Sequence, residues 1–509
     1  MTANPVWSVD PRTGKQRERV AAEATHRDVD RAVRAAHAAR AALAGAATRA
    51  AFLRTAADLL DGSAARIVES ADAETALGAA RLTGELARTT GQLRVFADCV
   101  DEGAYLDVRI DRADPSLTPP RPELRRYKVP LGVVAVYAAS NFPLAFSVPG
   151  GDTASALAAG CPVVVKAHPD HPATSELCAA LLREAATANG LPADVVTVVH
   201  GFDAGLELIR HPLVTAAGFT GSIRGGRALF DAAAARPVPI PFHGELGSLN
   251  PVVVTPAAVA ERAEEIGSGL AGSVTLGVGQ FCVKPGLVLV PTGQDGDRLA
   301  AALAKSLAGT EPGVLLDHRM REAFLAGTRE RAALPGVDAP VAPGPGGERS
   351  VGAGFLTVDA TTLLEDGPHE VLLEECFGPV TVLVRYADQS EAAAVLGRLG
   401  GNLSATLQLS EDETRGAPGP AAELISLVTG LAGRIVVNGW PTGVAVAPAQ
   451  HHGGPYPAAT SHATSVGATA VERWLRPVAY QSVPDALLPA ELREDNPLGL
   501  PRRVTGPGA

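Results

Sequence analysis

The sequence predicts an α/β fold built around parallel sheets. Short apolar segments, typical of buried strands, alternate with helix-like segments between residues 133 and 219. Because a helical crossover between successive strands makes them parallel, this alternation favours a parallel sheet with helices on its faces. The chain has 509 residues, too many for one ordinary core, so we expect two or three domains.

Composition narrows the possible partners and the compartment. The formal net charge is −11 and no basic stripe is present, which argues against nucleic acid and favours small-molecule partners. We find no secretory signal and no apolar run long enough to span a bilayer. The five scattered cysteines include no CxxC pair, which fits a reducing cytoplasm and no structural zinc.

Up to about residue 100, the chain is predicted to be helical after a loop-like opening. Residues 103–127 differ in composition and in predicted structure. Helices are expected over residues 25–46, 48–60, 64–76 and 74–100. On the last of these, we interpret Arg88, Gln92 and Arg94 as a solvated face rather than as substrate ligands. Residues 103–127 are rich in proline and alternate in charge, which indicates a β-hairpin-like excursion from the first domain.

The predicted sheet of the first domain leads to an anion site. Its strands and helices are expected at residues 133–137, 151–159, 162–166, 176–189, 195–199, 205–210 and 216–219. No GxGxxG fingerprint follows the first strand. Instead, Thr220, Gly221 and Ser222 precede a helix, where backbone N–H groups and a hydroxyl suit a pyrophosphate.

A second α/β domain is expected from residue 247. Its predicted elements are strands at 251–254, 286–290 and 434–438 and helices at 256–271 and 468–475, with a loop at 339–354.

The strongest chemical signal is a cysteine between glycines, in the segment GQFCVKPG at residues 279–286. Cys282 is a candidate nucleophile, since flanking glycines allow close approach to the sulfur, although a buried structural cysteine fits equally well by itself. Lys284 could lower the pKa of the thiol, but we interpret it as solvent-exposed. Glu245 supplies a carboxylate among small residues 37 positions earlier, in FHGELGSLNP.

These two segments resemble the aldehyde dehydrogenase superfamily. The resemblance implies a Rossmann-like cofactor domain, an α/β catalytic domain and a small β oligomerisation element. It also implies that Cys282 is the nucleophile and Glu245 the general base. Asn141, in SNFPLAFS, would form an oxyanion hole with the Cys282 N–H.

The resemblance also implies a cofactor site. Lys166 would meet the adenosine ribose, Thr220, Gly221 and Ser222 the pyrophosphate, and Glu375 and Phe377 the nicotinamide ribose and ring. His168 lies in a segment, residues 167–170, that lacks the glutamate common in members preferring NAD. We therefore predict NADP, with NAD possible, although Asp170 could take the part of that glutamate.

The implied reaction is oxidation of an aldehyde to an acid through a thiohemiacetal and a thioester on Cys282. Strings such as KAHPDHPATSE and HHGGPYPAATS resemble NADP-using members that include dehydrogenases of α-ketoglutaric semialdehyde, also called 2,5-dioxovalerate. A semialdehyde of this kind is therefore the expected substrate. Positions 445, 448 and 462 carry Ala, Pro and His where those members usually have Glu, His and Arg. The missing arginine at position 462 was a candidate for binding a substrate carboxylate.

The expected organisation follows the same resemblance. Residues 1–103 and 128–246 would form the nucleotide-binding domain and 247–440 the catalytic domain. Residues 104–127 and 476–490 would form the oligomerisation element of a homodimer or homotetramer, and 491–509 a tail.

Several alternatives remain at this point. They are a broad-specificity dehydrogenase of fatty, aliphatic or aromatic aldehydes, a CoA-acylating relative, a cysteine hydrolase and a non-catalytic protein that kept the fold. No metal is predicted, because His451 and His452 would face opposite ways in an extended chain and have no acidic neighbour in the sequence.

Overall fold

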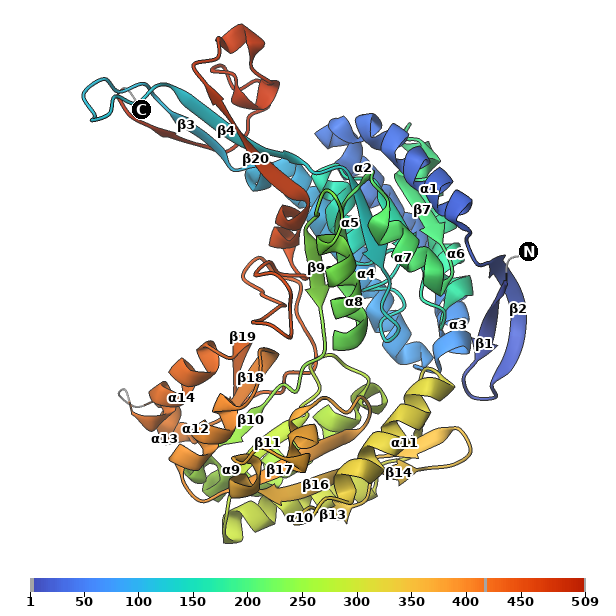
Figure 1. Cartoon of the computed structure of the whole chain (residues 1–509), viewed down its shortest axis with the longest axis vertical. Coiled ribbons are helices and arrows are strands. Elements are labelled where there is room, and N and C mark those ends of the chain that lie inside the picture. The colour runs from blue at the N-terminus through green and yellow to red at the C-terminus, as the bar shows by residue number, and fades with distance from the viewer. Residues whose placement is uncertain (1–3, 416–418, 508–509) are drawn as a thin grey trace.

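The computed structural model describes residues 4–415 and 419–507, and it contains two bodies and a projecting arm (Figure 1). The first and last residues of the predicted first domain and tail, 1–3 and 508–509, lie outside this description. The predicted α/β class with parallel sheets is confirmed. No described helix is both long and apolar enough to cross a membrane.

The first body contains a five-stranded sheet in which all neighbouring strands are parallel. The strand order is β7-β6-β5-β8-β9. Their bounds are β5 (Val133–Tyr137), β6 (Val163–Lys166), β7 (Val196–Val199), β8 (Val214–Thr220) and β9 (Phe242–Glu245). The sequence analysis predicted the first four, but it gave no strand to residues 242–245.

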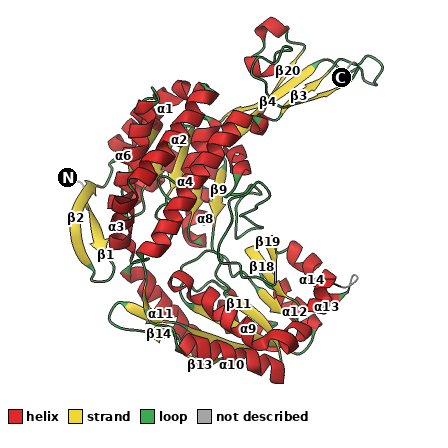
Figure 2. Cartoon of the chain, turned by 180° about the vertical axis from the view of Figure 1, so that it is seen from behind, coloured by secondary structure: helices red, strands yellow, loops and turns green. Residues whose placement is uncertain are grey.

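Helices cover both faces of this sheet, which explains why its strands are apolar throughout. Val134 and Val136 of β5 pack into one core, whereas Val133 and Ala135 pack into another on the opposite face. The first core includes residues of α2 (Ala46–Gly62), α3 (Ala64–Thr75), α4 (Ala79–Glu102), α5 (Gly151–Ala159) and α6 (Pro172–Ala188) (Figure 2). The second includes residues of α1 (His26–Ala39), α7 (Phe202–Arg210) and α8 (Ile223–Ala234).

The second body contains a seven-stranded sheet with the order β13-β16-β17-β11-β10-β18-β19. Its pairs are parallel, apart from the antiparallel pairing of β13 with β16. The strands are β10 (Val252–Val254), β11 (Leu287–Pro291), β13 (Asp338–Val341), β16 (Gly354–Asp359), β17 (Val380–Tyr386), β18 (Asn402–Gln408) and β19 (Ala432–Val437). The helices of this body are α9 (Pro256–Thr275), α10 (Gln294–Ala308), α11 (His318–Ala332), α12 (Gln389–Gly397), α13 (Glu411–Arg415) and α14 (Pro420–Thr429).

The arm is a four-stranded sheet that projects from the first body (Figure 1). It consists of β3 (Val108–Asp111), β4 (Leu124–Pro130), β20 (Leu475–Gln481) and β21 (Arg502–Thr505). The predicted tail therefore contributes β21, which pairs in parallel with β3.

Three other expectations differ from the structure. The predicted loop-like opening is a hairpin of β1 (Pro5–Asp10) and β2 (Lys15–Ala22). The predicted loop at 339–354 includes the end of β13 and the short strands β14 (Gly344–Pro345) and β15 (Ser350–Gly352), and β15 also pairs with β12 (Gly313–Val314). Residues Ala468–Trp474 form a 3-10 helix rather than an α-helix, and Trp474 at its end is fully buried in the first core.

The two sheets meet through opposite ends of their strands. Glu245 ends β9, and Asn141 lies in the loop after β5, so both lie beyond carboxyl ends in the first sheet. Cys282 and Glu375 instead lie before β11 and β17, at amino ends in the second sheet. The predicted site residues therefore gather where the two bodies face each other, outside the carboxyl ends of the first sheet, where ligands of such sheets usually bind.

Candidate active site

The loop that carries Cys282 is built on unusual backbone angles. After α9, Gly277, Val278 and Gly279 all have positive φ, and a side chain at Gly279 would collide with the Gly378 carbonyl. Glycine is therefore required at position 279, where the loop crosses the segment before β17. Val278 is a β-branched residue in the same left-handed region, so this turn is strained.

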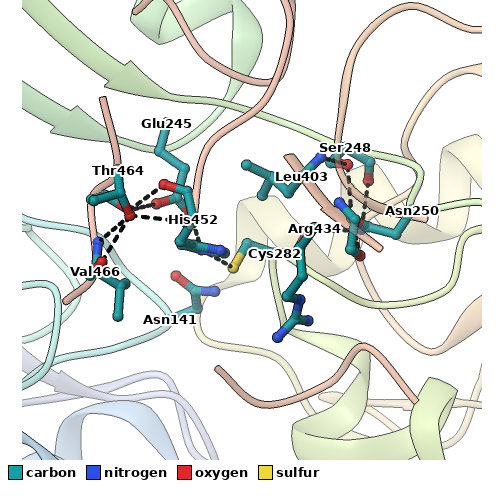
Figure 3. A network of polar contacts seen from close by, with 12 residues as sticks. Asn141, Glu245, Ser248, Asn250, Cys282, Leu403, Arg434, His452, Thr464 and Val466 are labelled. Atoms are coloured by element: carbon teal, nitrogen blue, oxygen red, sulfur yellow. Dashed lines mark hydrogen bonds and ion pairs between the residues drawn. The ribbon is translucent and has the colours of Figure 1, made fainter. Parts of the chain in front are cut away.

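Cys282, His452 and Glu245 form a compact cluster (Figure 3). The His452 Nε2 lies 3.6 Å from the Cys282 Sγ and 2.9 Å from a carboxylate oxygen of Glu245. The other oxygen of Glu245 accepts a 2.6 Å hydrogen bond from the Ser465 hydroxyl. The expectation that His452 has no acidic partner is therefore wrong, because Glu245 reaches it across 207 positions.

The hydrogen bonding of His452 indicates its protonation. Its ring is buried and its Nδ1 has no hydrogen-bond partner in the part of the chain that the structure describes. A proton on Nδ1 would leave a buried donor unpaired, whereas a proton on Nε2 is shared with the Glu245 carboxylate. The hydrogen bonding therefore places a proton of His452 on Nε2, which donates it to Glu245.

The charges in the cluster leave a carboxylate beside a thiol. Burial acts to raise the pKa of Glu245, but His452, Ser465 and Cys282 together hold it below its ordinary value. Burial, followed by the charge of Glu245, raises the pKa of Cys282 well above that of a free thiol, while the charge of Arg88 opposes this. The ionised Glu245 is thus placed to accept a proton. A carboxylate oxygen of Glu245, the Cys282 Sγ and a ring nitrogen of His452 all lie within 4.8 Å of one another.

Lys284 does not lie where the sequence analysis put it. Its side chain is buried and its ammonium donates a 2.7 Å hydrogen bond to the carbonyl of Val380. The interpretation of Lys284 as solvent-exposed is therefore wrong. The lysine ties the loop of Cys282 to β17, and the cations whose charges act on the thiol include Arg88 and Arg434.

Asn141 lies beside Cys282 (Figure 3). Its side-chain amide is buried and donates a 3.0 Å hydrogen bond to the carbonyl of Gln280. The carbonyl of Asn141 in turn accepts a 2.6 Å hydrogen bond from Arg81 on α4. These two contacts fix the amide at the sulfur, where a second N–H remains for a ligand.

Asn250 is a structural residue of the site to which the sequence analysis gave no role. Its side-chain amide donates to the carbonyls of Cys282 and Lys284, at 2.9 and 3.0 Å, and its oxygen accepts from Ser248 and Ser404 (Figure 3). The residue has a φ of 52°, which asparagine tolerates better than most residues. Asn250 therefore links the nucleophile loop to the second sheet, and the string SLNP alone carried no signal of these partners.

Two cavities on either side of the start of α8 suit a long, phosphate-bearing ligand. The first, of about 430 Å³, is lined by several predicted cofactor residues and by Arg319 of α11; the predicted ones are Lys166, His168, Thr220, Gly221 and Ser222. The second, of about 590 Å³, is lined by Ser222, Gly247 and Glu375 among others. Ser222 caps α8 by accepting a hydrogen bond from the Gly225 N–H, so free N–H groups of the first turn face this region.

The second cavity ends at a carboxyl group with unusual acidity. Burial raises the pKa of Glu375 to about 7, although Lys284 opposes the shift. Phe377 is half-buried and lines neither cavity. The hydroxyls, helix N-terminus and cations of the two cavities fit a dinucleotide.

Comparison with known proteins decides the family. Residues 2–454 match the model of the aldehyde dehydrogenase family. The chain belongs to this family. Its members oxidise aldehydes with NAD or NADP, so this chain is an NAD(P)-dependent aldehyde dehydrogenase, as the sequence predicted.

Individual relatives agree with the family. The chain is 48% identical over 473 residues to α-ketoglutaric semialdehyde dehydrogenase 2 of Azospirillum brasilense, covering 90% of this chain and 87% of that protein. It is 41% identical over 462 residues to α-ketoglutaric semialdehyde dehydrogenase of Acinetobacter baylyi, covering 90% and 86%. The crystal structure of succinic semialdehyde dehydrogenase from Streptococcus pyogenes, solved with NADP⁺, superposes with a TM-score of 0.79 at 18% identity, covering 94% of this chain and 100% of that one. It shares the fold.

A third cavity of about 260 Å³ opens beside Cys282 of this aldehyde dehydrogenase. Cys282 and His452 line it together with side chains of α4 and three phenylalanines, Phe142, Phe146 and Phe281. Arg88 also lines it, so the interpretation of Arg88 as part of a solvated face is wrong. Gln92 is buried as well, whereas Arg94 is 41% exposed and pairs with Asp58 and Asp61.

Proposed function

We propose that the chain oxidises a short semialdehyde that carries a carboxylate, of the α-ketoglutaric semialdehyde type, with NADP as the preferred cofactor. One observation carries the proposal: the cluster of Cys282, His452 and Glu245 opens into a small cavity that also contains arginine side chains. The names of the two relatives support the same substrate. The cavity is smaller than the roughly 300–1,000 Å³ of drug-sized pockets, which favours a short aldehyde over a fatty one.

The proposed chemistry begins with the thiol. Cys282 loses its proton to water in the adjacent cavity and adds as a thiolate to the aldehyde carbon. The oxyanion of the resulting thiohemiacetal accepts hydrogen bonds from the Asn141 amide and the Cys282 N–H. When bound, a nicotinamide cofactor would supply the acceptor for the hydride that leaves the thiohemiacetal carbon, which would leave a thioester on Cys282.

The second half of the reaction uses the carboxylate. Glu245 deprotonates a water, which attacks the thioester carbon and releases the acid and the Cys282 thiolate. Its lowered pKa keeps it ionised at neutral pH, as a base must be. His452 and Ser465 position the carboxylate, since each binds one of its oxygens.

Three features support a preference for NADP. The cations Lys166 and Arg319 both line the first cofactor cavity, where a 2′-phosphate needs positive charge. No glutamate follows Lys166 in residues 167–170. Asp170, the acid that could replace it, is a poor substitute, because burial and the charge of Asp317 raise its pKa to about 7.

Initial rates test the proposal directly. We expect α-ketoglutaric semialdehyde to be oxidised with a kcat/KM well above those of pentanal, decanal and benzaldehyde, and faster with NADP than with NAD at equal concentration. Arg319→Ala should raise the KM for NADP more than that for NAD. A preference for decanal or benzaldehyde would replace the substrate assignment with the broad-specificity alternative, and a strong NAD preference would overturn the cofactor assignment.

We also propose a homodimer or homotetramer that assembles through the arm and acts in the cytoplasm. The arm projects from the body, and Leu487 and Leu498 in the segment between β20 and β21 are more than half exposed, which suits an interface (Figure 1). All five cysteines are free, as expected in a reducing compartment. Light scattering of the purified protein tests the assembly, and a monomer would contradict it.

A further inference from the structure

Two arginines on one face of α4 point at the cavity beside the nucleophile. Arg81 and Arg88 are seven positions apart, which places them on the same side of a helix, two turns from each other. Both line the cavity that contains Cys282 and His452. The helix therefore presents two guanidinium groups to whatever occupies the cavity.

Each arginine keeps some buried donors without a partner in the described part of the chain. The buried Nε and Nη2 of Arg88 and the buried Nε and Nη1 of Arg81 have no hydrogen-bond partner there, and neither side chain forms an ion pair with a described residue. Arg81 does donate through Nη2 to the Asn141 carbonyl. Unpaired buried charge is costly, so side chains of this kind usually have a ligand.

The carboxylate between them is used elsewhere. Glu85 lies on the same helix face, but one of its oxygens accepts the N–H groups of Leu144 and Ala145, at 2.8 and 2.9 Å. Burial also raises the pKa of Glu85, despite the charges of Arg81 and Arg88. One oxygen of Glu85 therefore holds the loop after Asn141, while its other, buried oxygen has no hydrogen-bond partner in the described part of the chain. The two guanidinium groups still outnumber this one carboxylate at the cavity.

Aromatic rings lie against both guanidinium groups. The Arg81 Cζ lies 5.1 Å from the Phe142 ring centre and 4.7 Å from that of Phe281, and the Arg88 Cζ lies 5.2 Å from that of Phe146. A cation–π contact of this kind stabilises each guanidinium without using its N–H donors. Planar N–H edges match a carboxylate.

We infer that Arg88, together with Arg81, binds the carboxylate of the substrate while its aldehyde carbon meets Cys282. The inference rests on the proposed function and names the residues that select its substrate class, a short chain with an aldehyde at one end and a carboxylate at the other.

Arg88 is the better residue to test, because Arg81 also supports Asn141. The variants are Arg88→Met, Arg88→Lys and, as a matched control on the same helix, Arg94→Met, whose side chain lies at the surface. For each, kcat/KM is measured with α-ketoglutaric semialdehyde and with pentanal, a neutral aldehyde of equal chain length. Thermal unfolding checks that each variant is folded.

The expected result is a change in the ratio of the two kcat/KM values. Loss of a charge-assisted pair should lower this ratio about 100-fold in Arg88→Met, mostly through KM for the semialdehyde. Arg88→Lys should recover part of it, and Arg94→Met should leave it at the wild-type value. An unchanged ratio in Arg88→Met, in a wild-type enzyme that prefers the semialdehyde, overturns the inference and leaves the proposed function standing.

A second readout needs no substrate. Alkylation of Cys282 by iodoacetate, which carries a carboxylate, is compared with alkylation by neutral iodoacetamide. We expect Arg88→Met to lower the iodoacetate rate relative to the iodoacetamide rate by about 10-fold or more. If wild-type enzyme does not prefer the semialdehyde to pentanal, the proposed substrate class fails. If the ratio of the iodoacetate rate to the iodoacetamide rate is also the same in wild type and Arg88→Met, the inference that Arg88 binds a carboxylate is overturned, whatever the substrate.

Discussion

The cluster of Cys282, His452 and Glu245 and the arginines of the neighbouring cavity differ in how their polar groups are paired. Within the cluster, both oxygens of Glu245 are hydrogen-bonded, one to His452 and one to Ser465. In the cavity, Arg88 has buried donors with no partner among the described residues. The two regions share the side chains of Cys282 and His452, so they are adjacent parts of one site.

This difference indicates that the two sets of groups have different functions. Groups that are paired inside the protein are held at fixed positions and serve the chemical steps, which are the same for every aldehyde. Groups that are left unpaired carry a cost that a complementary ligand removes, so they select among aldehydes. Variants of the cluster should therefore lower turnover of all substrates by similar factors, whereas variants of the arginines should depend on substrate charge.

The largest expected effect comes from the nucleophile. Cys282→Ser should lower kcat by at least about 10⁴ for α-ketoglutaric semialdehyde and pentanal alike, since a serine hydroxyl is a far weaker nucleophile than a thiolate. The formation of reduced cofactor, followed at 340 nm, measures it. Cys376→Ser, a change at a half-buried cysteine outside the cluster, is the control and should keep its activity. Normal turnover by Cys282→Ser would contradict the mechanism.

Loss of the general base should have the next largest effect. Glu245→Gln should lower steady-state turnover by about 10²–10⁴ with either substrate, because thioester hydrolysis loses its base. Addition to the aldehyde and hydride loss should be affected less, so one equivalent of reduced cofactor should form in a rapid burst. The burst is measured by stopped flow, and trapped acyl-enzyme by mass spectrometry. Equal slowing of burst and steady state would show that Glu245 does not act chiefly in hydrolysis.

Much of the fold and part of the site were predictable because their signals are local. Strands such as β5 and β6 are short apolar runs between turn residues, and the glycines around Cys282 lie beside it in the chain. Their interpretation needed no knowledge of distant contacts. By contrast, β2 is mostly exposed and the one buried residue of β1 is the polar Ser8. Neither strand shows the apolar alternation that marks a strand, so their pairing left no clear pattern.

The missed parts of the site depend on contacts between distant segments. His452 acquires its role from Glu245, 207 positions away, and adjacent histidines in sequence gave no sign of that partner. Arg88 and Arg94 have the same chemistry and lie on the same helix, yet only the tertiary packing separates a cavity residue from a surface one. Lys284 would ordinarily be exposed, and its burial depends on the Val380 carbonyl of another strand.

A smaller effect is expected from the residue that ties the cluster to the second sheet. Asn250→Ala removes the donors to the carbonyls of Cys282 and Lys284 and places alanine at a φ of 52°. We expect a loss of about 2–4 kcal/mol in the free energy of unfolding, measured by urea titration, with turnover lowered equally for both substrates. Asn250→Gly removes the same hydrogen bonds without the backbone strain, so it should be about 1 kcal/mol more stable than Asn250→Ala. A stability equal to wild type would remove Asn250 from the support of the loop.

The smallest expected effect is a shift in the acidity of the nucleophile. Burial raises the pKa of Cys282, and the negative charge of Glu245 raises it further by opposing the thiolate. Glu245→Gln removes that charge while burial remains, so the thiolate becomes easier to form and the midpoint of alkylation by iodoacetamide should fall by about one pH unit. Arg88 opposes the rise in the pKa of Cys282, so Arg88→Met should move the midpoint the other way, to higher pH. Opposite shifts from the two variants would show that Glu245 raises the pKa of Cys282 and that Arg88 lowers it. A midpoint that rises in Glu245→Gln would instead mean that the carboxylate, through His452, mainly assists ionisation of the thiol.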